Sequence, residues 1–283
     1  MKKRIGIAII IGLLFILSSF IYMEGTPDSF NQKVTEVTST NTYVQDIPVI
    51  ETYRNDGKPK PIIIVQHGFK NRKESTIGLA IQLAEKGFFV VSPDAYAHGE
   101  RKEDPLSLVE IIVKTSKEYD VLLDHYAEDH RVNVNKLGIT GFSMGGCITF
   151  HYAVYGKYHP MAIAPTISTP YFEQLIGSKL SRSIYSSKQG LTVAEDMDTI
   201  NKIDNFIIIN SPFKDYKKLK NVDILMQNGK LDRYVNSDGV KMLNHVLPEI
   251  NPNVQLIMVP RTKHQVRPVM KDNIVEFMCQ NVK

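Results

Sequence analysis

Short apolar runs alternate with amphipathic stretches over most of the chain, and this alternation predicts the fold. Residues 62–65 are wholly apolar and β-branched, as expected for a strand buried on both faces. The same reasoning predicts further strands at residues 88–91, 137–140, 161–167, 222–226 and 254–259. Helices are predicted between or after them, at residues 76–86, 106–126, 147–154 and 269–279. Such alternation implies an α/β fold with a mostly parallel central sheet and helices on both faces.

Two regions depart from this alternation of strands and helices. Before the first buried run, residues 34–38 and 44–53 have extended patterns and residues 55–59 form a turn, which together suggest an N-terminal hairpin. Residues 170–221 are too long for a simple connection, yet they contain helical patterns of their own, so we expect a cap inserted over the sheet. The predicted organisation is a polar spacer with the first strand at 24–43, followed by one α/β domain at 44–283.

The N-terminus predicts export. Residues 5–23 are 19 residues without a charge, preceded by the basic cluster at residues 2–4. A helix of that length roughly spans the hydrocarbon core of a bilayer, and the positive cluster favours a cytoplasmic N-terminus. The end of the stretch lacks the small residues of a cleavage site, so residues 1–23 are predicted to be an uncleaved signal-anchor. The protein would then be a single-pass membrane protein with its body outside the cytoplasm; secretion after signal cleavage is the alternative.

Composition excludes several functional classes. The net charge of +4 is mild and spread along the chain, so we expect no nucleic-acid partner. Two cysteines do not make a disulfide framework, and no Cys/His cluster has the spacing of zinc ligands. Neither a P-loop nor a dinucleotide fingerprint occurs.

The motif G-x-S-x-G at residues 141–145 carries the strongest chemical signal. It follows a predicted apolar strand and precedes a predicted helix, which is the context that makes the motif meaningful. The serine of such a motif occupies a strained strand-to-helix turn, where a Cβ at either flanking position would clash. The sequence therefore predicts that Ser143 is a nucleophile, and the helix that follows presents free N–H groups toward developing negative charge.

The loop after the first buried strand supplies the predicted second half of an oxyanion hole. His67-Gly68-Phe69 follows residues 62–65, and the expected donors are the backbone N–H groups of Phe69 and Met144. His67 lies before the nucleophile, against the usual chain order of folds with this motif, so we expect it to brace the loop.

The general base and its acid partner are expected after the last two strands. His264 follows the strand at 254–259, and a neutral imidazole there can take the proton of the serine. Asp232 follows the strand at 222–226 and is the predicted acid that orients His264. Asp238 lies in the same loop, but its place beside a predicted helix start favours a capping role.

These motifs together resemble a known family. Residues 44–283 are similar to the α/β-hydrolases of the dienelactone hydrolase and prolyl-oligopeptidase-like serine esterase group. The likeness rests on His67-Gly68-Phe69, Asp94 with His98-Gly99, residues 131–146, Gly229 to Asp232, and His264. The resemblance implies a covalent acyl-serine intermediate and no metal or organic cofactor. Serine stands where dienelactone hydrolases themselves use cysteine, and no large N-terminal propeller is present.

The resulting functional prediction is a carboxylesterase-like serine hydrolase that acts on a small-molecule ester or a related acyl bond. An acyltransferase or peptidase would use the same three residues, because only the acceptor of the acyl group differs. A non-catalytic hydrolase-like surface protein is the remote alternative. Within the expected cap, four apolar side chains are predicted to line an acyl pocket: Tyr171, Phe172, Leu175 and Ile176.

Overall fold

The computed structural model describes residues 36–101, 104–179 and 181–283. The predicted signal-anchor or signal peptide at 1–23, and the first part of the predicted spacer, lie outside the described residues. Among the helices that the structure does describe, none is both long enough and apolar enough to cross a membrane.

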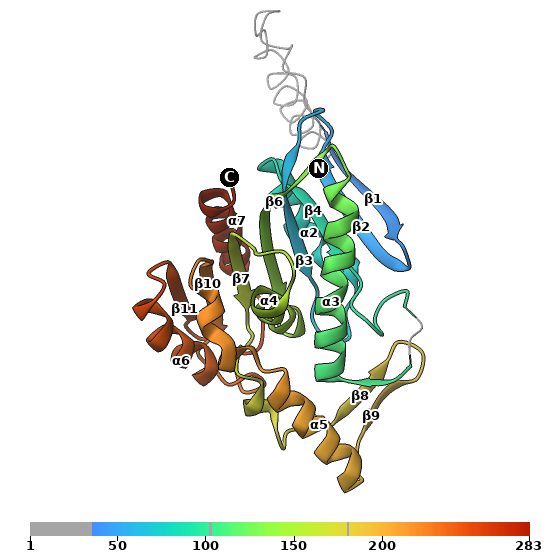
Figure 1. Ribbon diagram of the computed structural model, residues 1–283, viewed down its shortest axis with the longest axis vertical. Coiled ribbons are helices and arrows are strands. Elements are labelled where there is room, and N and C mark those ends of the chain that lie inside the picture. Colours follow the sequence, from blue (N-terminus) through green and yellow to red (C-terminus); the bar gives the residue numbers. More distant parts are fainter. Residues whose placement is uncertain (1–35, 102–103, 180) are drawn as a thin grey trace, which may run out of the picture. The chain divides into compact units, whose positions relative to one another are not determined.

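The core of the fold is an eight-stranded sheet in the order β1-β2-β4-β3-β6-β7-β10-β11 (Figure 1). Strands β1 and β2 pair antiparallel, β2 also pairs antiparallel with β4, and all remaining pairs are parallel. The strand bounds are β1 Val37–Val44, β2 Ile47–Arg54, β3 Lys60–Gln66, β4 Phe89–Pro93, β6 Val132–Phe142, β7 Ala162–Thr166, β10 Asp223–Gly229 and β11 Val254–Val259. The predicted mostly parallel sheet is confirmed.

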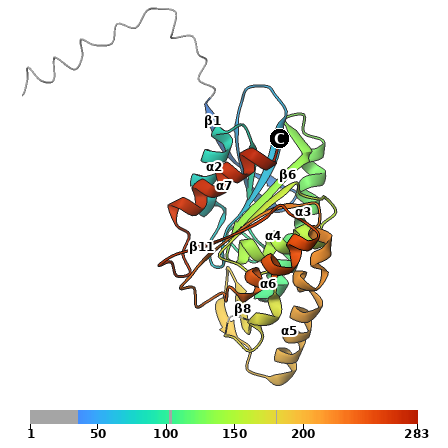
Figure 2. The ribbon, with the colours of Figure 1, turned by 90° about the vertical axis from the view of Figure 1, so that its left-hand side faces the viewer.

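Helices cover both faces of this sheet, as Figure 2 shows for α2 and α7 on one side and α3 and α4 on the other. Successive side chains of a strand point to opposite faces, so Ile62 and Ile64 of β3 join the core under α3 and α4, whereas Ile63 and Val65 join the core under α2 and α7. The helix bounds are α2 Ile77–Glu85, α3 Leu108–Ala127, α4 Met144–Tyr155, α6 Asp238–Val246 and α7 Pro268–Asn281. Cys147 and Cys279 are both free thiols.

Element boundaries differ from the prediction mainly at glycines and at polar strands. Helix α4 begins at Met144, three residues before the predicted start, because Gly145 and Gly146 continue the helix despite their low intrinsic propensity. The predicted strand at 34–38 corresponds to β1, which begins at Val37 and runs to Val44 because its polar residues pair in register with β2.

The predicted cap contains a hairpin that the sequence pattern does not reveal. Strands β8 (Ser183–Ser186) and β9 (Gly190–Val193) pair antiparallel, and β8 also pairs with the two-residue strand β5 (Leu106–Ser107) that precedes α3. The remaining cap elements are two 3₁₀ helices and one α-helix, with bounds η3 Phe172–Leu175, α5 Met197–Ile209 and η4 Pro212–Leu219. This small sheet attaches the cap to the start of α3.

Candidate active site

Ser143 occupies a strained turn between β6 and α4. Its backbone has φ +55° and ψ −114°, a conformation that a residue with a side chain adopts only at an energetic cost. The backbone N–H of Ser143 donates to the carbonyl of Thr166 at 2.9 Å, which holds the turn against β7. A Cβ on Gly145 would lie 2.4 Å from the Gln66 carbonyl oxygen, and one on Gly141 would lie 2.4 Å from the Gly145 carbonyl oxygen. A side chain at either position would clash with the backbone, so both positions require glycine, as the motif predicts.

A continuous hydrogen-bonded chain joins Ser143, His264 and Asp232. The Ser143 hydroxyl lies 2.8 Å from Nε2 of His264, and Nδ1 of the same ring lies 2.7 Å from Oδ2 of Asp232. An ionised carboxylate can only accept, so Nδ1 carries the proton and Nε2 is left to accept from the hydroxyl. The three residues come from the carboxyl ends of β6, β10 and β11, and this arrangement can move a proton from Ser143 to His264.

The acid of this chain is deeply buried and held in its charged form. The Asp232 side chain is 0% exposed, and its Oδ1 accepts the backbone N–H groups of Tyr234 at 2.9 Å and Val235 at 3.1 Å. Burial opposes ionisation, but the hydrogen bonds from His264 and from these two N–H groups outweigh it and lower the pKa of the Asp232 carboxyl. Asp238 instead lies exposed at the start of α6, where Asn236 and Lys241 are its partners.

The loop at His67-Gly68-Phe69 lies against the Ser143 turn. A Cβ on Gly68 would be 3.2 Å from the Phe142 carbonyl oxygen and 3.7 Å from the Ser143 Cβ. Phe69 and Met144 line the same cavity as Ser143 and His264. Among the described residues, the backbone N–H groups of Phe69 and Met144 donate to no acceptor in a neighbouring loop or turn, so both groups are available to a ligand.

A cavity of about 650 Å³ opens above Ser143. Its wall is mainly apolar and comes from α3, α4, the loop after β7, the cap and the loop after β10, with side chains that include Leu108, Ile112, Met144, Cys147, Ile167, Leu175, Leu191 and Val235. The volume suits a small-molecule substrate. In the part of the chain that the structure describes, no three His, Cys, Asp or Glu side chains gather as metal ligands would.

Only one of the four cap residues predicted to line an acyl pocket does so. Leu175 lines the cavity, whereas Phe172 is fully buried in the main core and Ile176 is 36% exposed. Tyr171 packs on Phe213, with the ring centroids 5.3 Å apart. Tyr171 and Ile176 flank the short 3₁₀ helix η3, and within it Phe172 packs into the core while Leu175 reaches the cavity. The sequence also missed Leu108, Ile112 and Leu191, since nothing local marks the start of α3 or the hairpin as part of the site.

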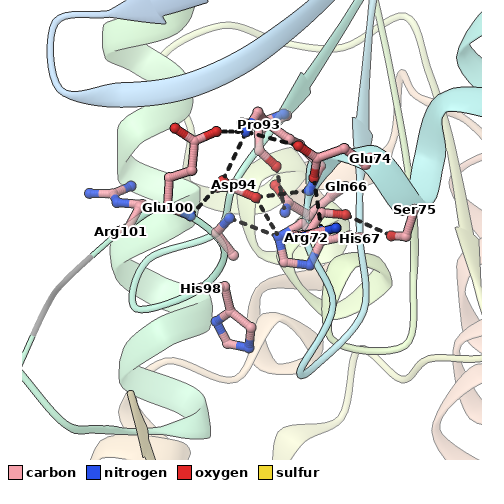
Figure 3. Close-up of polar contacts among 12 residues, drawn as sticks. Gln66, His67, Arg72, Glu74, Ser75, Pro93, Asp94, His98, Glu100 and Arg101 are labelled. Carbon is pink, nitrogen blue, oxygen red and sulfur yellow. Dashed lines mark hydrogen bonds and ion pairs between the residues drawn. The ribbon is translucent and has the colours of Figure 1, made fainter. Parts of the chain in front are cut away.

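A second polar network lies beneath the Gly68–Phe69 loop (Figure 3). Nδ1 of His67 is 2.8 Å from the Gly68 carbonyl oxygen, and Nε2 accepts the backbone N–H of Ala95 at 3.0 Å. Asp94, at the centre of the view, accepts the backbone N–H groups of Lys73 at 2.8 Å and Glu100 at 3.0 Å. Burial lowers the pKa of His67 to about 4, more than its bond to Gly68 raises it. The ring is therefore neutral and braces the loop.

Several known proteins are similar to this chain. Residues 50–187 match the model of the Dienelactone hydrolase family. Esterase YjfP of Escherichia coli (strain K12) is 24% identical over 254 residues, which cover 84% of this chain and 96% of that protein. Two solved structures also align with this chain. TT1662 from Thermus thermophilus has a TM-score of 0.67 and 18% identity, and the match covers 88% of this chain and 99% of the other. The Pyrococcus furiosus esterase Pf2001 has a TM-score of 0.61 and 17% identity, and the match covers 88% of this chain and 94% of the other. At these identities the structural likeness establishes a shared fold.

Proposed function

Since the chain belongs to the α/β-hydrolase superfamily, we propose that it is a serine hydrolase that cleaves a carboxylic ester through an acyl-serine intermediate. The observation that carries the proposal is the hydrogen-bonded chain from Ser143 through His264 to Asp232, at the floor of a mainly apolar cavity. The names of the similar proteins, two of which are esterases, support ester hydrolysis as the reaction class.

The geometry suggests the course of the reaction. As the Ser143 oxygen bonds to the ester carbonyl carbon, Nε2 of His264 takes the hydroxyl proton, and Asp232 stabilises the resulting imidazolium. The carbonyl oxygen gains negative charge, which the backbone N–H groups of Phe69 and Met144 would receive. His264 then protonates the departing alcohol. A water molecule, deprotonated by the same ring, releases the acid from Ser143 and returns the hydroxyl.

The test is hydrolysis of matched ester and amide substrates by the purified full-length protein. We expect turnover of p-nitrophenyl esters with short and medium acyl chains, and much slower turnover of the corresponding p-nitroanilides. The Ser143→Ala variant is the control, and its kcat should fall by on the order of 10³-fold or more. A protein that cleaves only amides, or that transfers the acyl group to an added alcohol faster than to water, would instead be a peptidase or an acyltransferase.

We also propose that the N-terminal segment anchors the enzyme in the cell membrane with the hydrolase domain outside the cytoplasm. The support is the uncharged stretch at residues 5–23 behind a basic cluster. Fractionation of cells should place the full-length chain in the membrane, and a protease added outside intact cells should cleave the hydrolase domain. Recovery of the intact chain in the soluble cytoplasmic fraction would reject this localisation.

A further inference from the structure

The loop that carries the Phe69 N–H donor is held differently on its two sides. On the side of β4, buried polar contacts fix it: His67 bridges Gly68 and Ala95, and Asp94 holds the backbone of Lys73 (Figure 3). These contacts lie within the hydrolase body and are independent of the cap. From this side the ring of His98, in the loop after β4, reaches the ring of Phe69.

On the cap side, the Phe69 ring lies among aromatic side chains. The ring of Tyr185 meets it edge to face, with centroids 5.1 Å apart and planes at 63°, and the ring of His98 meets it at 5.5 Å. Tyr185 and His98 also contact each other, with centroids 4.6 Å apart. Edge-to-face pairs of this kind contribute about 0.5–1.5 kcal/mol beyond the area they bury. Tyr185 is the member of this cluster that comes from the cap.

The strand that carries Tyr185 also forms part of the substrate cavity. Tyr185 of β8 lies opposite Leu191 of β9 and opposite Leu106 of β5, so the three side chains share one face of the small sheet. Leu191 lines the cavity above Ser143. The same face of the cap therefore contacts the space for substrate and the loop of the oxyanion hole.

We propose that Tyr185 is a positioning residue that holds the Phe69 N–H in place. The position of the cap hairpin is thereby coupled to the geometry of the oxyanion hole. The inference rests on the proposed function, because the donor matters only if an oxyanion forms above Ser143. Tyr185 acts through the ring of Phe69 and does not itself touch the reacting atoms. Its hydroxyl has no recorded hydrogen-bond partner among the described residues, so the aromatic ring alone carries the role.

The decisive variants are Tyr185→Leu and Tyr185→Phe, assayed with a p-nitrophenyl acetate substrate whose acyl group is too short to depend on the cap. Loss of the ring in Tyr185→Leu should lower kcat by roughly 10-fold to 100-fold, because misplacing one oxyanion donor weakens transition-state stabilisation. KM should change by less than about 3-fold. Tyr185→Phe keeps the ring and should retain wild-type kcat. An unchanged kcat in Tyr185→Leu would overturn the proposal, as would a rise in KM alone, which would make Tyr185 a pocket residue only.

Two controls separate positioning from stability. Tyr216→Leu removes another half-buried aromatic ring, one that packs on Phe213 5.9 Å away and does not line the cavity. It should lower the melting temperature about as much as Tyr185→Leu while leaving kcat unchanged. An equal loss of kcat in both variants would mean that Tyr185→Leu acts through a general loss of structure, which would overturn the proposal.

The second control is a double-mutant cycle with Phe69→Leu, which keeps the backbone N–H but removes the ring. If Tyr185 acts through that ring, Tyr185→Leu should lower kcat much less in the Phe69→Leu background than in wild type. Fully multiplicative losses would contradict the mechanism. Failure of the proposed function is distinguishable, because the wild-type protein would then show no Ser143-dependent hydrolysis at all.

Discussion

Two aspartate–histidine pairs lie at the carboxyl edge of the same sheet, and they have different environments. Asp232 and Asp94 both follow strands and both have side chains that are 0% exposed. Asp232 accepts a hydrogen bond from Nδ1 of His264 at 2.7 Å, whereas Nε2 of His67 lies 3.9 Å from Oδ1 of Asp94. His264 is 21% exposed and faces Ser143, while His67 is fully buried with both ring nitrogens bonded to backbone groups.

The comparison teaches that a histidine beside an aspartate is a base only if one ring nitrogen remains free to meet a reacting proton. In the first pair the carboxylate orients the ring and leaves Nε2 for the serine. In the second pair the ring accepts one backbone N–H and donates to a backbone carbonyl, while the carboxylate accepts two backbone N–H groups, so both side chains position loops. The residue types are the same in both pairs and both aspartates are buried, so the difference in proposed role comes from the exposure of His264 and from what each side chain touches.

Substituting His264 of the first pair, or the serine that it faces, should give the largest effect on activity. Ser143→Ala and His264→Ala should each lower kcat by on the order of 10³-fold or more, because the three residues act as one unit. For the same reason, the double variant should be little worse than either single variant. Steady-state kinetics on the ester substrate measure this, with circular dichroism to verify folding. Wild-type kcat in folded Ser143→Ala protein would refute the assignment of the nucleophile.

The same substitution in the two pairs should give opposite outcomes. Asp232→Asn keeps the Oδ1 acceptor for Tyr234 and Val235, but its amide donates toward Nδ1 and favours the wrong tautomer of His264. We expect kcat to fall by on the order of 10³-fold, with little change in melting temperature.

Asp94→Asn should mainly affect stability. Both Asp94 oxygens accept backbone N–H groups, so the new amide would leave one buried N–H without an acceptor. It would also remove the negative charge that pairs with the buried Lys73 ammonium. The expected cost is about 1–3 kcal/mol in the free energy of unfolding, with kcat of the folded protein reduced less than about 10-fold. Urea unfolding followed by circular dichroism measures it. An Asp94→Asn variant as inactive and as stable as Asp232→Asn would remove the distinction between the pairs.

The histidine of the second pair should also make stability depend on pH. Burial lowers the pKa of His67 to about 4, and burial lowers the pKa of His98 to about 4 as well. The unfolded chain binds these protons near pH 6.5, so the stability that the neutral rings contribute is complete above pH 6.5 and declines as the pH falls toward 4. Each ring accounts for about 3 kcal/mol over that range.

Urea unfolding at pH 7 and pH 5 checks this prediction. Of the predicted effects it is the smallest at neutral pH, because the free energy of unfolding changes only as the pH falls below 6.5. A His98→Phe variant removes one buried titrating ring from its aromatic surroundings, so its stability should depend less steeply on pH than that of the wild type. Equal pH dependence in the two proteins would mean that His98 does not remain neutral in the folded state.

The two pairs also show how far the sequence alone reaches. Ser143, His264 and Asp232 are predictable because each follows a strand that its apolar residues make recognisable, and parallel strands bring their carboxyl ends to one edge. The strain at Ser143 is likewise implied by the neighbouring glycines. The bracing role of His67 follows from chain order, but the network around Asp94 does not, because it joins loops more than 20 residues apart by contacts that no local pattern encodes.

The cap is where prediction from sequence fails. Tyr171, Phe172, Leu175 and Ile176 were expected to line an acyl pocket, but of these four only Leu175 lines the cavity. The hairpin of β8 and β9 is short, its second strand is wholly exposed, and its partner β5 has two residues, so no periodic pattern marks it. Leu191 and Tyr185 reach the site through this pairing, which only tertiary structure specifies.

The central claim is that His264 activates Ser143 as the nucleophile, and active-site labelling tests it most directly. A fluorophosphonate probe should label the wild-type protein at one residue, and peptide mass spectrometry should place the adduct on Ser143. Labelling should disappear in Ser143→Ala and should be strongly slowed in His264→Ala, while Tyr216→Leu should label as fast as wild type. An adduct on any other residue, or undiminished labelling of folded Ser143→Ala protein, would contradict the account.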